Sequence, residues 1–301
     1  MTELSKDCLD FGHVKLLNIA GPSGAPMGSR QLQRDAAKTA RMSFGGAGKQ
    51  HTEEKDMGLS GYLWNEEHST PFEFIQVWLE MKMPIFVSRQ LVRHRTVSIN
   101  EESMRYIDAC CDWYIPEQFG AKAANVKQGS VGVLDAADNT ELRGLLDSAC
   151  ADGFQRYNRA LEMGTSNEHA RLFLHVNHYT RWWWRQDFRN LMHMVRLRTD
   201  PHAQMETRVY AEAVVELVRE QMPDLIAVVE EANALIKVPP LALGLLLDYS
   251  IKYVFNKRTN SNDPEERALL NERLDVLFEI QTVLGSGGKP QRKLYGALLG
   301  V

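Results

Sequence analysis

Hydrophobic and polar residues alternate in two segments of the chain, as they do in half-buried strands. Residues 13–20 are apolar at alternate positions, and residues 72–83 alternate in part and are rich in aromatic and β-branched residues. Residues 141–163 and 203–222 carry apolar residues at helical spacing, which predicts amphipathic helices. Further helices are predicted over residues 31–42, 52–67, 168–176, 188–197, 241–255 and 263–284.

Proline and polar residues mark where these elements begin and end. Pro84 is predicted to open a short helix, because proline is tolerated at the first helical position. Pro223 is predicted to end one helix, and Asp224 is a candidate N-cap of the next. Residues 96–100 are expected to form an irregular loop, and residues 120–140 a surface excursion without helical period.

Two interpretations fit the glycine-rich residues 44–49, FGGAGK. Such a run is compatible with a loop that cradles phosphate groups. The full GxxxxGK[ST] spacing of that loop is absent, however. A plain flexible loop is therefore the favoured interpretation, and the phosphate loop is the alternative.

The overall charge argues against a polyanionic partner. The 301 residues are 44% hydrophobic and 25% charged, with a formal net charge of −4, which favours neither nucleic acid nor a membrane surface. Positive charge is instead local: residues 89–105 contain four arginines, and residues 181–198 contain five. This pattern predicts a small anionic ligand.

Neither the N-terminus nor the cysteines point to secretion or to a metal site. Residues 1–13 lack the apolar core of a signal peptide, and no stretch is apolar for long enough to cross a bilayer, so a cytoplasmic protein is expected. The four cysteines have no metal-binding spacing. Free thiols are therefore expected, and a metal site or a strained disulfide at Cys110 and Cys111 is the alternative.

Ligand-binding chemistry is concentrated in residues 90–106. This window holds three arginines, a histidine, two carboxylates, two serines, an asparagine and a tyrosine. Guanidinium groups suit phosphates because their fork binds anionic oxygens in pairs. A high density of charge is equally typical of a solvated surface. Only the order of the residues can distinguish a ligand-binding site from such a surface.

That order resembles the signature of the flavin-dependent thymidylate synthases, in which RHR is followed by a spacer and S.RY. Here RHR occupies residues 93–95 and SMRY residues 103–106. Three further segments resemble the same family in the same order: HSTPFE at 68–73, YTRWWW at 179–184 and LRTDPHAQMETRVYA at 197–211. The resemblance extends over roughly residues 13–235 and is more specific than any single motif.

The resemblance implies a fold, a reaction and an assembly. The fold would be α/β, or more strictly α+β, with a mainly antiparallel central sheet flanked by helices. The family domain would span residues 1–238. The resemblance does not extend to residues 239–301, where the sequence pattern itself predicts a helical extension packed on that domain as two helices. The reaction would be the reductive methylation of dUMP to dTMP by a methyltransferase. It would use 5,10-methylenetetrahydrofolate as one-carbon donor, FAD as hydride carrier and NADPH as reductant, in a homotetramer with active sites between subunits.

The resemblance also assigns roles to individual residues. Those that match nucleotide-binding positions are Gln90, Arg93, Glu101, Ser103, Arg105, Tyr106, Arg181 and Arg208. Those that match flavin positions are Ser43, His68, Thr70, Glu73, Arg93, His94, Arg95, Glu101, Arg196, Arg198 and His202. Arg196 departs from the family, which often has asparagine or another small polar residue there.

Arg208 is the residue expected to act in the chemistry. It matches an arginine that polarises the uracil ring at N3, where a guanidinium would stabilise developing negative charge. A salt bridge to Glu212, one helical turn away, is the alternative role. Ser103 is not expected to be a nucleophile, because no base is within sequence reach and the family's hydride chemistry needs none. Successive residues 182–184, all tryptophan, must face alternate sides of a strand, so at least one belongs to the core.

Other classes of function fit less well. A thymidylate synthase with a cysteine nucleophile would need a Pro-Cys pair, and no cysteine follows a proline. A non-catalytic flavin- or nucleotide-binding relative would be expected to have lost Arg105, Arg208 or the RHR segment, and all are present. An RNA-binding module would need a basic face, which the net charge of −4 disfavours.

Overall fold

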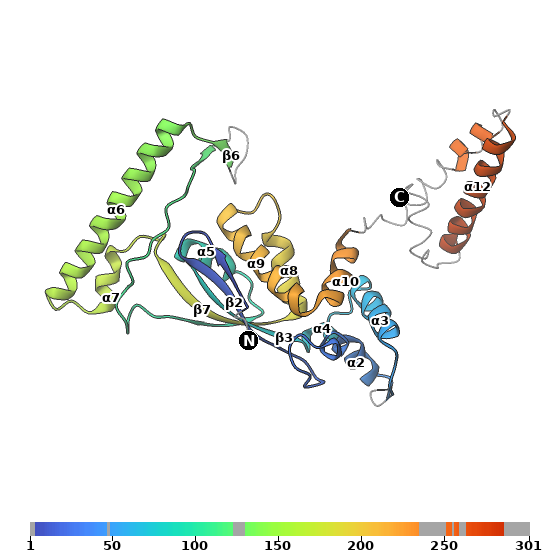
Figure 1. Ribbon diagram of the computed structural model, residues 1–301, viewed down its shortest axis with the longest axis horizontal. Coiled ribbons are helices and arrows are strands. Elements are labelled where there is room, and N and C mark those ends of the chain that lie inside the picture. Colours follow the sequence, from blue (N-terminus) through green and yellow to red (C-terminus); the bar gives the residue numbers. More distant parts are fainter. Residues whose placement is uncertain are drawn as a thin grey trace. The chain divides into compact units, whose positions relative to one another are not determined.

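A five-stranded antiparallel sheet lies at the centre of the first part of the chain, with strand order β1-β2-β3-β7-β4 (Figure 1). In this computed structural model the described residues are 4–46, 49–122, 130–234, 251–254, 256–258 and 263–285. The chain divides into two units, residues 1–233 and 234–301. Each neighbouring pair of strands is antiparallel, which confirms the predicted sheet.

Helices and strands alternate irregularly along the chain. The strands are β1 (Ser5–Cys8), β2 (Gly12–Ala20), β3 (Gln76–Pro84), β4 (Val97–Glu101), β5 (Gly120–Lys122), β6 (Ser130–Val133) and β7 (Tyr179–Asp187). The helices are α1 (Arg30–Gln33), α2 (Asp35–Met42), α3 (Glu53–Asn65), α4 (Thr70–Glu73), α5 (Ile85–Leu91), α6 (Ala136–Glu162), α7 (Asn167–Ala170), η1 (Arg171–Phe173), α8 (Phe188–Arg198), α9 (Met205–Gln221), α10 (Pro223–Ala234) and α12 (Pro264–Gly285).

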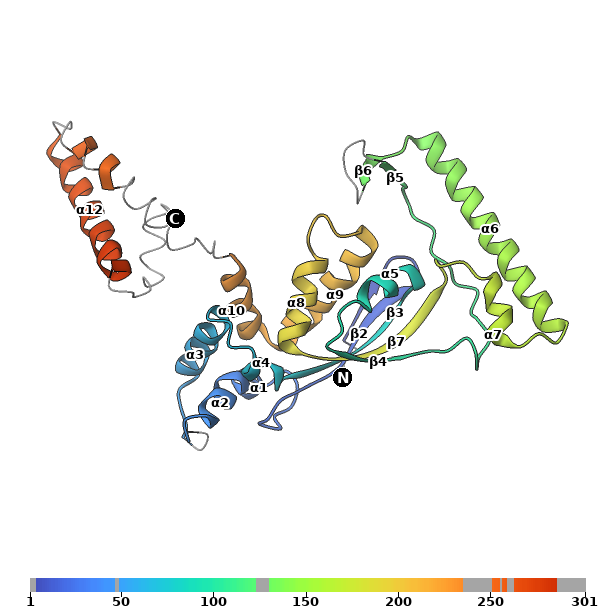
Figure 2. The ribbon, with the colours of Figure 1, turned by 180° about the vertical axis from the view of Figure 1, so that it is seen from behind.

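One face of the sheet is covered by α5, α8 and α9 and forms the core (Figures 1 and 2). Alternate residues of β3 and β7 point into it, because successive side chains of a strand face opposite sides. Trp182 and Trp184 are buried there, whereas Trp183 between them is 61% exposed. The predicted alternation of the three tryptophans is therefore confirmed, with two of them in the core.

The other face of the sheet is not closed by the described residues. Arg181, Trp183 and Arg185 project from it and are exposed. A polar group joins three of its strands: the Trp183 indole N–H donates to Glu80 at 3.2 Å, and His13 Nε2 lies 3.2 Å from the same carboxylate. A large aromatic side chain is thus exposed to solvent beside a partly buried carboxylate.

Two boundary predictions near the site are wrong. Residues 96–100 are not an irregular loop, because Val97–Glu101 pair with β7 as the edge strand β4. The strand predicted from Phe72 begins only at Gln76, since Thr70–Glu73 form the short helix α4. Proline is tolerated in the first turn of a helix, and Pro71 and Phe72 are buried by that turn.

Three further predictions are corrected elsewhere in the chain. The excursion at 120–140 contains the β5–β6 pair, and α6 already begins at Ala136, capped by the Asp135 carboxylate. The helix predicted over 168–176 ends at Ala170 and continues only as the 3-10 turn η1. Asp224 is not an N-cap, because α10 begins at Pro223; the Asp224 amide donates to the distant side chain of Gln33 at 2.7 Å.

The second unit contains α12, which confirms the helix predicted over 263–284. It begins after Asp263, whose carboxylate accepts a hydrogen bond from the Glu265 amide at 2.9 Å. Residues 251–254 are helical, and the rest of the helix predicted over 241–255 lies outside the described residues. Within the part of the chain that the structure describes, no helix is both long and apolar enough to cross a membrane.

A buried histidine beside β7 makes the stability of the fold pH-dependent. His178 is fully buried, and neither ring nitrogen has a hydrogen-bond partner among the described residues. Burial, followed by the charge of His175, lowers the pKa of His178 from 6.5 to about 4. Between these two values the unfolded chain binds a proton at His178 that the folded chain does not. The contribution of neutral His178 to the free energy of unfolding is therefore fully present above pH 6.5 and decreases as the pH falls.

We therefore expect the free energy of unfolding, measured with urea at a series of pH values, to fall between pH 6.5 and about 4. His178→Phe should remove on the order of 3 kcal/mol of that fall, because each pKa unit corresponds to about 1.4 kcal/mol. An equally steep fall in the variant would show that other groups are responsible.

Candidate active site

A first group of predicted ligand residues gathers where α5, α8 and α9 meet. Arg198, at the end of α8, donates from Nε to His94 Nε2 at 3.1 Å and from Nη2 to the Gln90 carbonyl at 3.0 Å. The Gln90 amide in turn donates to the side chain of Gln204, just before α9. Residues more than one hundred positions apart are thus joined around one guanidinium group.

His94 is neutral in this group. Burial, followed by the charge of Arg198 and the neighbouring His193, lowers its pKa from 6.5 to about 4. A neutral imidazole carries a proton on one nitrogen and accepts on the other. Because Nε2 accepts from Arg198, the proton resides on Nδ1, and that N–H is available to donate to a ligand.

Arg208 lies on the first turn of α9, one turn after Gln204, and its amide donates to the Gln204 carbonyl at 3.0 Å. Its guanidinium is half-buried, and the Glu212 carboxylate lies 3.9 Å from its Nε. That separation is too long for a hydrogen bond. The salt bridge considered as an alternative role therefore leaves the donors of Arg208 largely unused.

Several predicted flavin residues surround this group with positive charge. Arg93, Arg95 and Arg196 are exposed, and none has an ion pair with a described residue. His202 is exposed as well and lies 2.8 Å from the Asp200 carboxylate. Guanidinium groups without carboxylate partners fit the pyrophosphate of a flavin dinucleotide, since phosphate oxygens accept their paired N–H donors.

A second group lies at the end of β4, beside β7. The Glu101 carboxylate accepts a hydrogen bond from Thr180 at 2.7 Å, and the Glu102 amide donates to the Arg181 carbonyl at 2.8 Å. Ser103 accepts from the Arg105 amide at 3.3 Å, so its hydroxyl contacts its own loop rather than a base.

Arg105 and Tyr106 complete this second group. Arg105 pairs with Glu168 of α7 at 3.0 Å, and its guanidinium lies 5.7 Å from the centre of the Tyr106 ring. Tyr106 itself is 78% exposed. The phenol and the guanidinium are therefore both accessible from solvent, as groups that receive a nucleotide must be.

A third group lies around α4, which packs against α2 and α8. His68 stacks on Tyr62 with ring centres 6.3 Å apart, and it is exposed, as are Thr70 and Glu73. Ser43 follows the last residue of α2 and is exposed too. These side chains present polar groups to solvent on one side of the α2–α4 contact.

No direct hydrogen bond or ion pair between described residues joins one group to another. Glu101 pairs in register with Trp182 and so faces the helix-covered side of the sheet, whereas Arg181 faces the open side. Two residues predicted to bind the same nucleotide thus belong to opposite faces.

Sequence reasoning missed three residues that hold these groups in place: Gln204, Thr180 and Glu168. Gln204 and Thr180 fall inside segments that carry the family resemblance, so their motifs contained a usable signal. Glu168 lies outside those segments, and only the fold places it against Arg105. No group of three or more potential metal-ligating side chains exists among the described residues.

Comparisons with known proteins show the family of this chain. Residues 28–224 match the family model described as thymidylate synthase complementing protein. The chain is 36% identical over 230 residues to the flavin-dependent thymidylate synthase of Gluconobacter oxydans, covering 75% of this chain and 72% of that one. The chain belongs to the flavin-dependent thymidylate synthase family. All four motif segments fall inside the matched residues.

Other members of the family are similar over comparable lengths. The flavin-dependent thymidylate synthase of Thermus thermophilus is 38% identical, covering 74% of this chain and 77% of its own. That of Dictyostelium discoideum is 34% identical over 264 residues, covering 87% of this chain and 86% of its own.

A solved structure shares the fold. The UMP/dUMP methylase PolB of Streptomyces cacaoi, bound with 5-Br dUMP, is 26% identical and has a TM-score of 0.64, covering 75% of this chain and 97% of that one. Its structure bound with 5-Br UMP has a TM-score of 0.63. The family fold expected from the sequence is therefore present.

Proposed function

We propose that this chain catalyses the reductive methylation of dUMP to dTMP. Membership of the flavin-dependent thymidylate synthase family supports the reaction, with 5,10-methylenetetrahydrofolate as one-carbon donor, FAD as hydride carrier and NADPH as reductant. The observation that carries the proposal is the group around Arg198, where RHR, α8 and the start of α9 meet beside Arg208. When bound, the flavin supplies the hydride; the chain supplies charge and orientation.

The residues divide this work between them. Arg208 would stabilise negative charge that develops near N3 and O4 of the uracil; the unused donors of its half-buried guanidinium support this role. Neutral His94, held by Arg198, would donate from Nδ1. Arg93, Arg95 and Arg196 neutralise phosphate, and Gln90, Ser103, Arg105, Tyr106 and Arg181 hold the nucleotide.

The assembly is proposed to be a cytoplasmic homotetramer with sites between subunits. Two observations support it. The predicted ligand residues fall into three groups that no direct hydrogen bond or ion pair between described residues joins, which fits a site completed by groups from different subunits. The open face of the sheet also exposes Trp183, which a neighbouring subunit would cover.

The division of the chain at residue 238 is also kept as a proposal, with residues 239–301 as a helical extension that serves solubility or assembly rather than chemistry. A truncation after residue 238 that stays soluble and assembles as the full chain does should keep its turnover. Loss of turnover in such a truncation would assign the extension a part in the chemistry.

Competing substrates test the proposed reaction. Initial rates of methylation are to be measured with dUMP and with UMP, each with 5,10-methylenetetrahydrofolate, NADPH and FAD. UMP is the relevant competitor because the solved methylase of similar fold was bound with analogues of both nucleotides. Faster methylation of dUMP supports the proposal; methylation of UMP alone would assign the chain to the ribonucleotide reaction.

Arg198→Met should weaken FAD binding by about a hundredfold. The variant loses the two hydrogen bonds that orient His94 and the Gln90 carbonyl, and a loss of about 2.7 kcal/mol of binding free energy corresponds to a hundredfold. Flavin fluorescence quenching measures the affinity. Arg219→Met is the matched control, because Arg219 pairs with Glu230 near the opposite end of α9. Equal affinities in both variants would remove Arg198 from the flavin site.

A further inference from the structure

A polar cavity of about 500 Å³ lies between α2 and the start of α3, and two of its lining residues, Arg41 and Gly46, flank Ser43 of the third group in the sequence. Its charged lining consists of Arg34, Lys38, Arg41, Lys49, His51 and Asp56. None of these residues is in the predicted site. A volume of this size accommodates a small molecule, since ligand pockets typically measure about 300–1,000 Å³.

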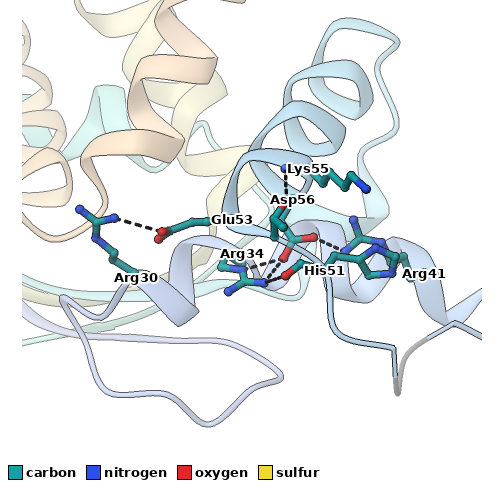
Figure 3. A network of polar contacts seen from close by, with 8 residues as sticks. Arg30, Arg34, Arg41, His51, Glu53, Lys55 and Asp56 are labelled. Atoms are coloured by element: carbon teal, nitrogen blue, oxygen red, sulfur yellow. Dashed lines mark hydrogen bonds and ion pairs between the residues drawn. The ribbon is translucent and has the colours of Figure 1, made fainter.

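Asp56 is the only carboxylate among the described residues of the lining, and it is already satisfied. Its side chain is 5% exposed, and Arg34 Nε donates to one of its oxygens at 2.6 Å. Arg41 donates to the other oxygen. Figure 3 shows the two guanidinium groups on either side of Asp56. The single negative charge of Asp56 neutralises only one of the two guanidinium groups, so this network carries a net charge of +1.

Two lysines add to this excess. Lys38 is half-buried, Lys49 is exposed, and neither ammonium group has an ion pair with a described residue. The acidic residue of α2, Asp35, is fully buried and accepts hydrogen bonds from Ser23 instead. The lining therefore carries four permanent cations against one carboxylate. Like charges in a concave surface repel each other, and a bound anion would relieve that repulsion.

The chemistry of the walls narrows the class of anion. Besides His51 the described lining contains no aromatic ring, so it offers little on which a nucleobase or flavin ring would stack. It does contain the amides of Gln31 and Gln50, which donate to oxygen. Forked guanidinium groups and ammonium groups together suit phosphate oxygens.

We propose that this cavity binds a pyrophosphate group, either free or as part of a dinucleotide. Binding of pyrophosphate itself is independent of the proposed function, whereas the two candidate sources of the group rest on it. In that reaction two molecules carry such a group: the flavin dinucleotide and the nicotinamide dinucleotide. The proposal therefore names the shared chemistry, and the experiment separates the sources.

The experiment is a calorimetric titration of inorganic pyrophosphate into the flavin-free full chain, in which the cavity is open whichever dinucleotide is its ligand. The test variant is Lys38→Gln with Lys49→Gln, which leaves the Arg34–Asp56–Arg41 network intact. Lys55→Gln is the matched control. Lys55 lies next to Asp56 on α3, but its side chain points away from the network (Figure 3).

The double variant should bind pyrophosphate at least about tenfold more weakly, the control should bind as the parent chain does, and added salt should weaken the parent's binding. If NADP+ loses affinity for the double variant to the same extent, the nicotinamide dinucleotide is the source. If FAD does so in the flavin-free chain, the source is the flavin. Pyrophosphate that fails to bind the parent, or binds both variants equally, would overturn the proposal. If the double variant folds poorly, the pyrophosphate affinity of Lys49→Gln alone is measured instead, and it should also be lower than that of the parent chain.

Discussion

Arg208→Ala is expected to lower the rate of dTMP formation by about two to three orders of magnitude while FAD remains bound, because one preorganised donor to a developing anion contributes about that much. The structure gives the reason. The guanidinium is half-buried and lies 3.9 Å from Glu212, so its N–H groups remain available to a uracil ring. It also sits one turn after Gln204, which binds Gln90 of the predicted nucleotide site. The rate is measured under saturating dUMP, and bound flavin by its absorbance.

Two further variants separate this role from a structural one. Glu212→Gln removes the only carboxylate within 4 Å of the Arg208 guanidinium among the described residues, so a helix-stabilising ion pair would be lost in both cases. We expect turnover close to that of the parent in Glu212→Gln. Arg208→Lys keeps the positive charge but lacks the forked guanidinium donors, so its turnover should lie between those of Arg208→Ala and Glu212→Gln. Near-normal turnover in Arg208→Ala, or an equal loss in Glu212→Gln, would remove Arg208 from the chemistry.

Asp56→Asn is expected to lower the free energy of unfolding by about 3–5 kcal/mol, because removing one partner of a buried ion pair leaves an uncompensated charge. Here two charges would be left. The side chains of Arg34 and Arg41 are only 23% and 16% exposed, and both converge on this carboxylate. Arg34 also donates to the His51 carbonyl at 2.6 Å, so the loss would loosen the segment that leads into α3. Urea unfolding at neutral pH measures the difference.

Glu53→Gln is the control for that prediction on the same helix. Glu53 pairs with Arg30 at 3.0 Å, but the arginine side chain is 78% exposed. Exposed ion pairs contribute about 0–1 kcal/mol, so the change should be small. Comparable losses in Asp56→Asn and Glu53→Gln would mean that burial does not set the strength of the Asp56 network.

Local periodicity predicted much of the fold. The alternating residues 13–20 form β2, and the helical spacing of residues 203–222 forms α9, because in both the apolar side must meet a core. The alternation of Trp182, Trp183 and Trp184 followed from strand geometry alone. Family motifs predicted candidate residues, and the fold joins Gln90, His94 and Arg198 through hydrogen bonds.

Features that depend on pairing between distant segments of the chain could not be predicted from the sequence. Residues 97–101 become a strand only because β7 lies beside them, and their sequence alone does not show this partner. The opposite orientations of Glu101 and Arg181 depend on the same register. The basic cavity brings Arg34 and Arg41 onto Asp56 from another helix, and no spacing of charges along the chain indicates that convergence.

The central claim is that this chain makes dTMP with the help of a flavin. The direct measurement is dTMP formation by the purified chain given dUMP, 5,10-methylenetetrahydrofolate and NADPH, with FAD and without it. The account predicts product that depends on FAD. Product that forms equally well without any flavin, or none at all from a flavin-loaded chain, would contradict it.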